Sequence, residues 1–353
     1  MSKMLDEIRE QPKSLETTLA TGIKSSEGPR KRLGGWKPRL VIIAARGSSD
    51  NAGQFGRYLI EIAAGIPISL AAPSVFTLYG ATIDLHDVLV VGISQSGEST
   101  DTNRFLERAK ELGAVTVGIT NGAGSTMAKL VDCALLVRAG RERSVAATKT
   151  YTGQLLMLYL LVHALGGRVR LDALRRIPDW VSAALRLESV IAERSTAYRY
   201  MERALVVGRG FNYGDALEFA LKLMETCQVV ADRFSSADLL YGPIAMVAPS
   251  FPVFVFAPAG VTTPSLQAVL DRLSALRAET LVFTDRHSRG TVRGMAAEIT
   301  VPIARSAAPG EPDDLYTPIP YIVPAQIFAA SLAGHKRLDP DSPRGLRKIT
   351  RTL

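Results

Sequence analysis

Cysteine is scarce in this sequence. Cys133 and Cys227 are the only two among 353 residues, and they lie far apart in apolar surroundings. A disulfide framework or a zinc site needs several metal-binding or bridging side chains at short spacings. The sequence therefore predicts neither, and we expect both thiols to be buried and inert.

Long apolar runs are also missing. The stretch Leu155–Leu165 contains His163 and falls short of the roughly 20 residues that a membrane-spanning helix needs. The first residues, Met1–Ile8, mix charged and apolar side chains, unlike a secretory signal. These absences predict a cytoplasmic protein with no membrane partner.

Aromatic residues make up only 7% of the chain, whereas hydrophobic residues as a whole make up 47%. Plentiful Ala and Leu are typical of α/β layers, and the length suggests two domains. The net charge is +8, but the arginines are scattered and no helix-turn-helix or aromatic–basic module is visible. We expect no nucleic-acid partner and a basic surface that attracts anionic substrates.

What the sequence does have is a cluster of hydroxyl side chains, Ser94–Thr102, between a predicted buried strand at 88–93 and a helical pattern at 104–112. A strand, a glycine-containing loop and a helix start present free backbone N–H groups and the positive end of the helix dipole to an anion. The loop has no lysine and is therefore not a Walker-type nucleotide loop. It suits the phosphate of a small molecule.

A simpler interpretation of this loop is a well-capped helix, because Ser and Thr are favoured N-cap residues. One hydroxyl would be enough for that purpose. Four hydroxyls and Gln95 within residues 94–100 favour phosphate binding.

Apolar runs alternate with helical patterns along the first half of the chain. Strands separated by helices predict a parallel sheet covered on both faces. The predicted strands are 40–45, 66–70, 88–93, 115–119 and 133–137, and the predicted helices are 2–20, 50–64, 148–165 and 171–194, with a connector at 24–38.

The pattern begins again at Ala204. Strand patterns ending near 210, 260, 285 and 301 repeat those ending near 47, 97, 121 and 137, at a nearly constant offset of about 163 residues. The sequence therefore predicts the α/β class, as two tandem copies of a three-layer α/β/α domain with parallel sheets. The predicted parts are an N-terminal helix and connector (1–38), the two domains (39–194 and 195–340) and a C-terminal tail (341–353). The second copy has Pro258–Thr263 in place of the serine-rich loop.

Several motifs occur in an order that resembles the sugar isomerase (SIS) double-domain family, which includes the isomerase part of glucosamine-6-phosphate synthase and SIS-type deaminases. The likeness covers nearly the whole chain. Its motifs lie at 10–12, 46–49, 94–99, 145–149, 217–225, 242–245 and 341–348.

The resemblance implies roles for individual residues. Glu225 would shuttle a proton between C1 and C2 of a sugar, Lys348 would reach the sugar's reactive end, and Val145 would lie against the substrate. Lys222, one helical turn before Glu225, would face the same site. The residues implied to bind the sugar phosphate are Ser48, Ser94, Gln95, Ser96 and Ser99.

The implied chemistry is consistent with these residue types. Aldose–ketose interconversion needs one base, and a carboxylate whose pKa is raised by partial burial can serve near neutral pH. A nearby ammonium can stabilise the enediolate or promote ring opening. The alternatives are a surface pair between Glu225 and Lys222, which would contribute a few tenths of a kcal/mol, and a solvated basic tail around Lys348.

Three positions depart from the family pattern. Tyr241 stands where the family has the histidine assigned to ring opening, Ala147 replaces a serine, and Met224 replaces a lysine. Tyrosine can donate a proton, but its unperturbed pKa of about 10 makes it a poor base at neutral pH. Ring opening is therefore expected to be slower or to use another group.

The family's synthase also carries a glutaminase domain with a nucleophilic cysteine at its start, which this sequence lacks. The expected reaction is accordingly the conversion of glucosamine 6-phosphate and water to fructose 6-phosphate and ammonia. Alternatives are a related phosphosugar isomerase, a deaminase for another amino-sugar phosphate, or a non-catalytic phosphosugar sensor. The resemblance implies no metal or organic cofactor, and a homodimer with the site at the subunit interface and Tyr241 reaching across it.

Overall fold

The computed structural model describes residues 2–33, 35–288, 293–304 and 308–348, and for residues 25–33 it describes the backbone alone. The chain forms two compact units built from interleaved segments. The first-sheet unit contains residues 13–142, 147–175 and 347–348, and the second-sheet unit contains residues 2–12, 143–146 and 176–346. This division differs from the linear boundaries at 38, 194 and 340, because the first residues of the chain and the short segment 143–146 belong with the second sheet.

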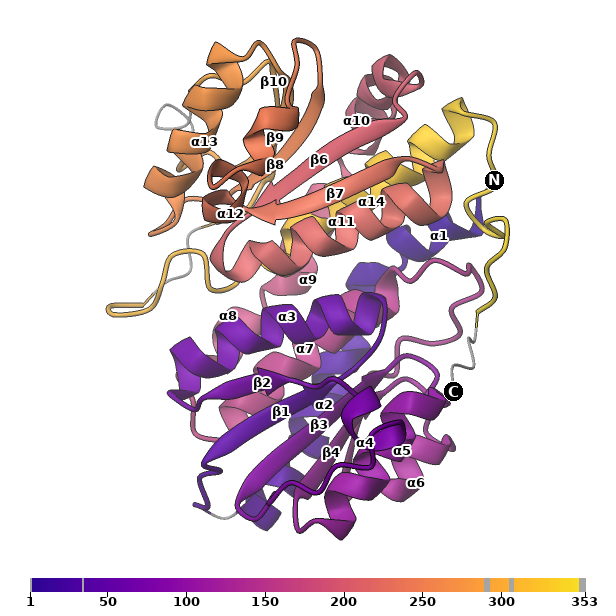
Figure 1. The fold of residues 1–353 in the computed structure, drawn as a ribbon, viewed down its shortest axis with the longest axis vertical. Helices are drawn as coiled ribbons and strands as arrows, with labels where there is room; N and C mark the ends of the chain where they lie inside the picture. Colours follow the sequence, from indigo (N-terminus) through magenta and orange to yellow (C-terminus); the bar gives the residue numbers. More distant parts are fainter. Residues whose placement is uncertain (1, 34, 289–292, 305–307, 349–353) are drawn as a thin grey trace. The chain divides into compact units, whose positions relative to one another are not determined.

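The first-sheet unit is organised around five parallel strands in the order β2-β1-β3-β4-β5 (Figure 1). All seven residues of the central strand β3 are buried, which explains the continuous apolar run in the sequence. The strands are β1 (Leu40–Ala44), β2 (Ile68–Leu70), β3 (Val88–Ser94), β4 (Val115–Thr120) and β5 (Cys133–Leu136).

The second-sheet unit repeats this topology with the order β10-β9-β8-β6-β7. Read from its other end, this order is β7-β6-β8-β9-β10. It therefore equals that of the first sheet when the strands of each sheet are counted along the chain. The predicted fold class of two tandem α/β domains with parallel sheets is therefore confirmed. The strands are β6 (Arg203–Gly208), β7 (Val230–Ser235), β8 (Pro252–Ala257), β9 (Glu279–Thr284) and β10 (Ala297–Thr300).

Helices cover both faces of the first sheet. Helix α3 packs against α7, whereas α5 packs against α4 and α6 (Figure 1). Helix α7, predicted at 148–165, is buried from Lys149 to Val162, so none of its faces is open to solvent over that length. The helices are α2 (Gln11–Leu33), α3 (Ser48–Leu59, continued by a π-helical turn, Ile60–Ala64), α4 (Ser74–Thr77), α5 (Thr100–Glu111), α6 (Thr126–Leu130), α7 (Lys149–Ala164) and α8 (Leu171–Leu174).

The second sheet is covered in the same manner. Helix α14 packs against α1, α9, α10 and α11, whereas α12 packs against α13. The helices are α1 (Lys3–Arg9), α9 (Ile177–Leu185), α10 (Glu188–Ser195), α11 (Tyr213–Cys227), α12 (Ser236–Leu240), α13 (Thr263–Ala275) and α14 (Pro318–His335), with 3-10 turns at Thr196–Tyr198, Gly210–Asn212 and Pro243–Met246.

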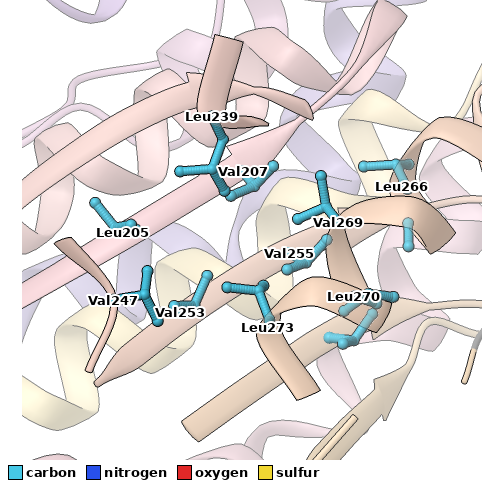
Figure 2. Packing of buried hydrophobic residues seen from close by; sticks show 12 residues of the cluster. Leu205, Val207, Leu239, Val247, Val253, Val255, Leu266, Val269, Leu270 and Leu273 are labelled. Carbon is cyan, nitrogen blue, oxygen red and sulfur yellow. The ribbon is translucent and has the colours of Figure 1, made fainter. Parts of the chain in front are cut away.

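The packing of α13 on the second sheet shows how this core is built (Figure 2). Branched aliphatic side chains of β6 and β8 point to one face, where residues spaced three or four apart on α13 meet them. Such close packing of aliphatic side chains removes apolar surface from water, which is the main stabilising contribution to the fold. The residues are Leu205, Val207, Val253, Val255, Leu266, Val269, Leu270 and Leu273.

Two helix predictions were wrong in their boundaries. Helix α2 continues to Leu33, through the segment that was predicted to be a connector. The predicted single helix 171–194 is three helices, α8, α9 and α10. Pro178 lies in the first turn of α9, where its missing N–H does no harm, whereas in the middle of a longer helix it would remove a hydrogen bond. Within the described ranges, no helix combines the length and apolarity that crossing a bilayer requires.

The surroundings of one buried carboxyl group, that of Asp314, disfavour the negative charge that aspartate usually carries. Asp314 is only 1% exposed, and its Oδ1 has no hydrogen-bond partner among the residues that the structure describes. Burial, helped by the neighbouring charge of Asp313, raises the pKa of Asp314 from 3.8 to about 6. The native state therefore holds this proton more tightly than the unfolded chain does.

We expect Asp314→Asn to stabilise the protein more at pH 8 than at pH 4. Protonation of Asp314 stabilises the native state at low pH, and this contribution is lost as the pH rises through about 6. The amide mimics the protonated form, so the variant's advantage should grow by about 2–3 kcal/mol between these pH values. Urea unfolding at both pH values measures it, with Asp172→Asn, at an exposed side chain, as the control. An advantage independent of pH would contradict the assignment.

Candidate functional site

The order of the first sheet creates one place where neighbouring loops diverge. Strands β1 and β3 are adjacent and parallel, but the chain leaves β1 toward β2 on one side and leaves β3 toward β4 on the other. In open parallel sheets, ligands bind in the crevice at the carboxyl ends of such a strand pair. Ser48, the first residue of α3, and the loop 94–99 both lie at these ends. The predicted phosphate-binding residues therefore meet at one sheet edge.

Hydrogen bonds within the serine-rich loop define its shape. The Oγ of Ser94 accepts the backbone N–H of Gly97 at 3.1 Å, and the Oγ of Ser96 accepts that of Glu98 at 3.2 Å. The hydroxyl of Ser99 lies 3.0 Å from that of Thr102. Ser99 is the N-cap residue of α5, yet its side chain makes no capping hydrogen bond. The hydroxyls shape the loop and do not simply cap the helix.

Gly97 is the tightest point of this loop. Its φ of +70° lies in the left-handed region, and a Cβ atom added there would lie 2.2 Å from the Oγ of Ser125. The next residue, Glu98, fastens the loop to α6 by accepting the N–H of Thr126 at 3.0 Å and its hydroxyl at 2.8 Å. Only glycine permits this close approach of the loop to the start of α6.

A guanidinium group lies at the same sheet edge. Arg46, just after β1, forms an ion pair of 3.1 Å with Asp101 in the first turn of α5. The arginine is 49% exposed, whereas the aspartate side chain is 9% exposed. This bond joins the loops that follow β1 and β3, and sequence reasoning did not single out either residue.

The C-terminal lysine contacts a buried carboxylate of the first-sheet unit. The Nζ of Lys348 donates to Oε2 of Glu142 at 2.8 Å, and their side chains are 26% and 0% exposed. Burial alone would raise the pKa of Glu142, but the charge of Lys348 and the donors of Thr148 and Thr150 hold it below its usual value. Lys348 is therefore held in place and is not part of a freely solvated tail.

In the second-sheet unit, three of the charged side chains of α11 form one cluster. Lys222 is completely buried and lies 3.3 Å from Oε1 of Glu218 and 2.5 Å from Oε2 of Glu225. Burial alone would lower the pKa of Lys222, but the two carboxylates outweigh burial and raise it. Glu218 is 0% exposed, whereas the side chain of Glu225 is 23% exposed. Of the two carboxylates, Glu225 is the one that presents surface to a ligand.

This arrangement differs from a surface salt bridge. A buried ammonium is strongly disfavoured without compensating charges, and removing one partner of such a pair typically costs about 3–5 kcal/mol. Glu225 follows Lys222 by three residues and Glu218 precedes it by four, and these spacings place both carboxylates on the same helix face as the ammonium. Sequence reasoning missed Glu218, although its spacing from Lys222 was a readable signal.

Two further predicted site residues, Tyr241 and Val145, lie outside these charged clusters. Tyr241 caps the short helix α12, and its side chain is 92% exposed. Val145 is half-buried in the second-sheet unit, where its N–H donates to the carbonyl of Asp341 at 3.1 Å. Among the described residues, no recorded hydrogen bond or ion pair joins Tyr241 to Lys222 or Glu225.

A cavity of about 560 Å³ lies beside the serine-rich loop, between α5 and α6. Its lining includes Glu98, Thr100, Arg104 and Thr126, and none of the predicted phosphate-binding residues. In the described part of the chain, no group of three or more His, Cys, Asp or Glu side chains is arranged to hold a metal ion.

The family model for the SIS domain matches residues 36–164 and 198–333, once for each sheet. The chain belongs to the SIS domain family. Glutamine–fructose-6-phosphate aminotransferase (isomerizing) of Chlorobaculum tepidum is 33% identical over 362 residues, which cover 98% of this chain and 57% of that protein. The chain thus spans little more than half the length of this curated relative.

Two solved structures are similar to this SIS protein over most of its length. The C-terminal domain of glucosamine-fructose-6-phosphate aminotransferase from Francisella tularensis has a TM-score of 0.87 and 26% identity, covering 97% of this chain and 98% of that one. Glucosamine-6-phosphate deaminase from Thermotoga maritima has a TM-score of 0.76 and 20% identity, covering 99% and 100%. The second likeness concerns the fold alone.

We expect Gly97→Ala to lower the free energy of unfolding by about 1–3 kcal/mol, because it adds both backbone strain and a steric overlap. Gly124→Ala is the matched control in the next turn, where an added Cβ would meet nothing within 4 Å, and it should change stability by less than about 0.5 kcal/mol. Urea unfolding compares the two. Equal stability of both variants would show that the loop does not need its glycine.

Proposed function

We propose that this SIS protein interconverts an aldose and a ketose phosphosugar, with glucosamine 6-phosphate and water giving fructose 6-phosphate and ammonia as its specific reaction. The observation that carries the proposal is the partly exposed carboxylate of Glu225, held by the buried ammonium of Lys222. A fixed carboxylate that a ligand can reach is what a proton shuttle between adjacent carbons requires.

The proposal assigns substrate binding to the loop at the carboxyl ends of β1 and β3. Backbone N–H groups at the start of α5, with the hydroxyls of Ser48, Ser96 and Ser99, suit a phosphate dianion. Arg46 adds a positive charge at the same edge. Fructose 6-phosphate appears in the name of the Chlorobaculum tepidum relative, which supports a hexose 6-phosphate as the ligand.

In the proposed reaction, Glu225 removes the proton from C2 of the open-chain amino sugar and delivers it to C1. The resulting imine at C2 takes up water and releases ammonia, which leaves the ketone of fructose 6-phosphate. Lys222 and Lys348 supply positive charge, which stabilises an enediolate or enolamine as it forms. The same proton transfer without the amine is a simple aldose–ketose isomerisation.

The identity and the exposure of Tyr241 bear on a second candidate function and on assembly. Because a histidine opens the ring in the family's enzymes, its replacement favours a second candidate function, a phosphosugar sensor that binds without turnover. The 92% exposure of this side chain also suits a residue that acts in a neighbouring subunit. We therefore propose a homodimer in which the site lies at the subunit interface.

Wild-type protein should release ammonia from glucosamine 6-phosphate, and Glu225→Gln should lower kcat at least about 1000-fold while phosphosugar affinity changes little. The amide keeps the shape of the side chain but cannot accept the substrate's proton. Coupled ammonia detection and calorimetric binding measure the two effects. Glu202→Gln, at an exposed position directly before β6, is the control. Tight binding without turnover by wild type would favour the sensor, and neither binding nor turnover would overturn both readings.

Ser96→Ala should weaken phosphosugar binding about tenfold. The phosphate loses one hydroxyl donor, and the backbone N–H of Glu98 loses the oxygen that accepts its hydrogen bond. Ser69→Ala, at an exposed position of the edge strand β2, should leave affinity unchanged. Isothermal titration calorimetry with fructose 6-phosphate compares the variants. If Ser96→Ala retained full affinity, the phosphate would have to bind elsewhere.

A further inference from the structure

The carboxylate of Glu142 joins three separate parts of the first-sheet unit. It accepts the backbone N–H groups of Thr148 at 3.0 Å and Thr150 at 3.1 Å, and the hydroxyl of Thr150 at 2.7 Å. These bonds satisfy the start of α7, whose own N-cap residue, Thr148, makes no side-chain capping bond. The remaining bond comes from Lys348, 206 residues further along the chain.

Capping a helix does not by itself explain this arrangement. A Ser, Thr or Asp at the N-cap would satisfy the start of α7 without burying a whole glutamate. The side chain of Glu142 is instead 0% exposed, and it remains ionised because Lys348 and the threonine donors lower its pKa by more than burial raises it. The charged group that this buried carboxylate binds is the ammonium of Lys348.

The loop that carries Glu142 is in turn tied to the serine-rich loop through Asn121. The backbone N–H of Asn121 donates to the carbonyl of Gln95 at 3.1 Å. Its side-chain amide donates to the carbonyl of Gly140 at 2.8 Å and accepts the N–H of Ala139 at 2.8 Å. A continuous set of hydrogen bonds therefore connects residues 139 and 140, just before Glu142, to the loop proposed to bind phosphate.

We propose that Glu142 is a positioning residue for Lys348: it holds the lysine's amine at a fixed place relative to the serine-rich loop, in register with a sugar anchored there by its phosphate. This inference rests on the proposed function for the identity of the ligand. Its physical basis is that a catalytic group held in place before the substrate arrives avoids the entropy cost of ordering a flexible tail.

The test compares Glu142→Gln with Thr150→Val. The first removes the charge that holds Lys348, and the second deletes another bond to the same carboxylate without touching the lysine. Reductive methylation with formaldehyde and cyanoborohydride, read by peptide mass spectrometry, reports how freely the amine of Lys348 reacts. The exposed Lys37 and Lys129 serve as internal references in the same digest.

In Glu142→Gln, Lys348 should be methylated at least about threefold faster than in wild type, and in Thr150→Val at the wild-type rate. With phosphosugar, Glu142→Gln should lower kcat at least tenfold while KM and the affinity for inorganic phosphate change less than threefold. Thr150→Val should keep most of kcat even where both variants lose similar stability in urea.

Equal methylation of Lys348 in wild type and Glu142→Gln, or equal loss of kcat in the two variants, would overturn the inference. The methylation experiment needs no turnover. A wild-type protein that turns over no phosphosugar would therefore overturn the proposed function, while the labelling rates would still decide whether Glu142 holds the lysine.

Discussion

The reversal of strand order within each parallel sheet is the constraint on which the candidate site depends. Every strand of a parallel sheet ends at the same edge, but only between β1 and β3 in the first sheet, and between β6 and β8 in the second, do the following connections part in opposite directions. In the first sheet this crevice is bordered by hydroxyls, a helix start and Arg46. The second sheet has the same topology with Pro258–Thr263 at the equivalent point, so the duplicated fold carries an asymmetric set of functional groups.

Buried charge is the second organising feature. Lys222 lies between two carboxylates on α11, and Glu142 collects donors from α7 and from Lys348. Such groups are rarely the most stabilising choice for an interior, because desolvation offsets much of the attraction between them. They do fix the positions of ammonium and carboxylate groups closely. In both clusters one member keeps partial exposure, Glu225 in the first and Lys348 in the second, and these are the groups to which the proposal assigns chemistry.

Much of the fold could be predicted because buried parallel strands are continuous apolar runs, and a nearly constant offset revealed their duplication. Strand β7 was missed because Asp232 and Arg233 interrupt its apolar pattern at the sheet edge. The break near Arg176 was missed although Pro178 was a readable signal, and the break near Leu187 was missed because no proline or glycine marks it. The serine-rich loop and Lys222 beside Glu225 were readable from local spacing. The pairing of Glu142 with Lys348 was not, since no local pattern links residues so far apart in sequence.

Solvent exchange of a carbon-bound proton tests the central claim most directly. With fructose 6-phosphate in deuterium oxide, proton NMR should show wild-type protein incorporating deuterium at C1 and, once the aldose forms, at C2, because a single base exchanges its proton with solvent between transfers. Glu225→Gln should bind the sugar and incorporate none. Saturated binding by wild type with no deuterium at either carbon, for fructose 6-phosphate and glucosamine 6-phosphate alike, would contradict the account.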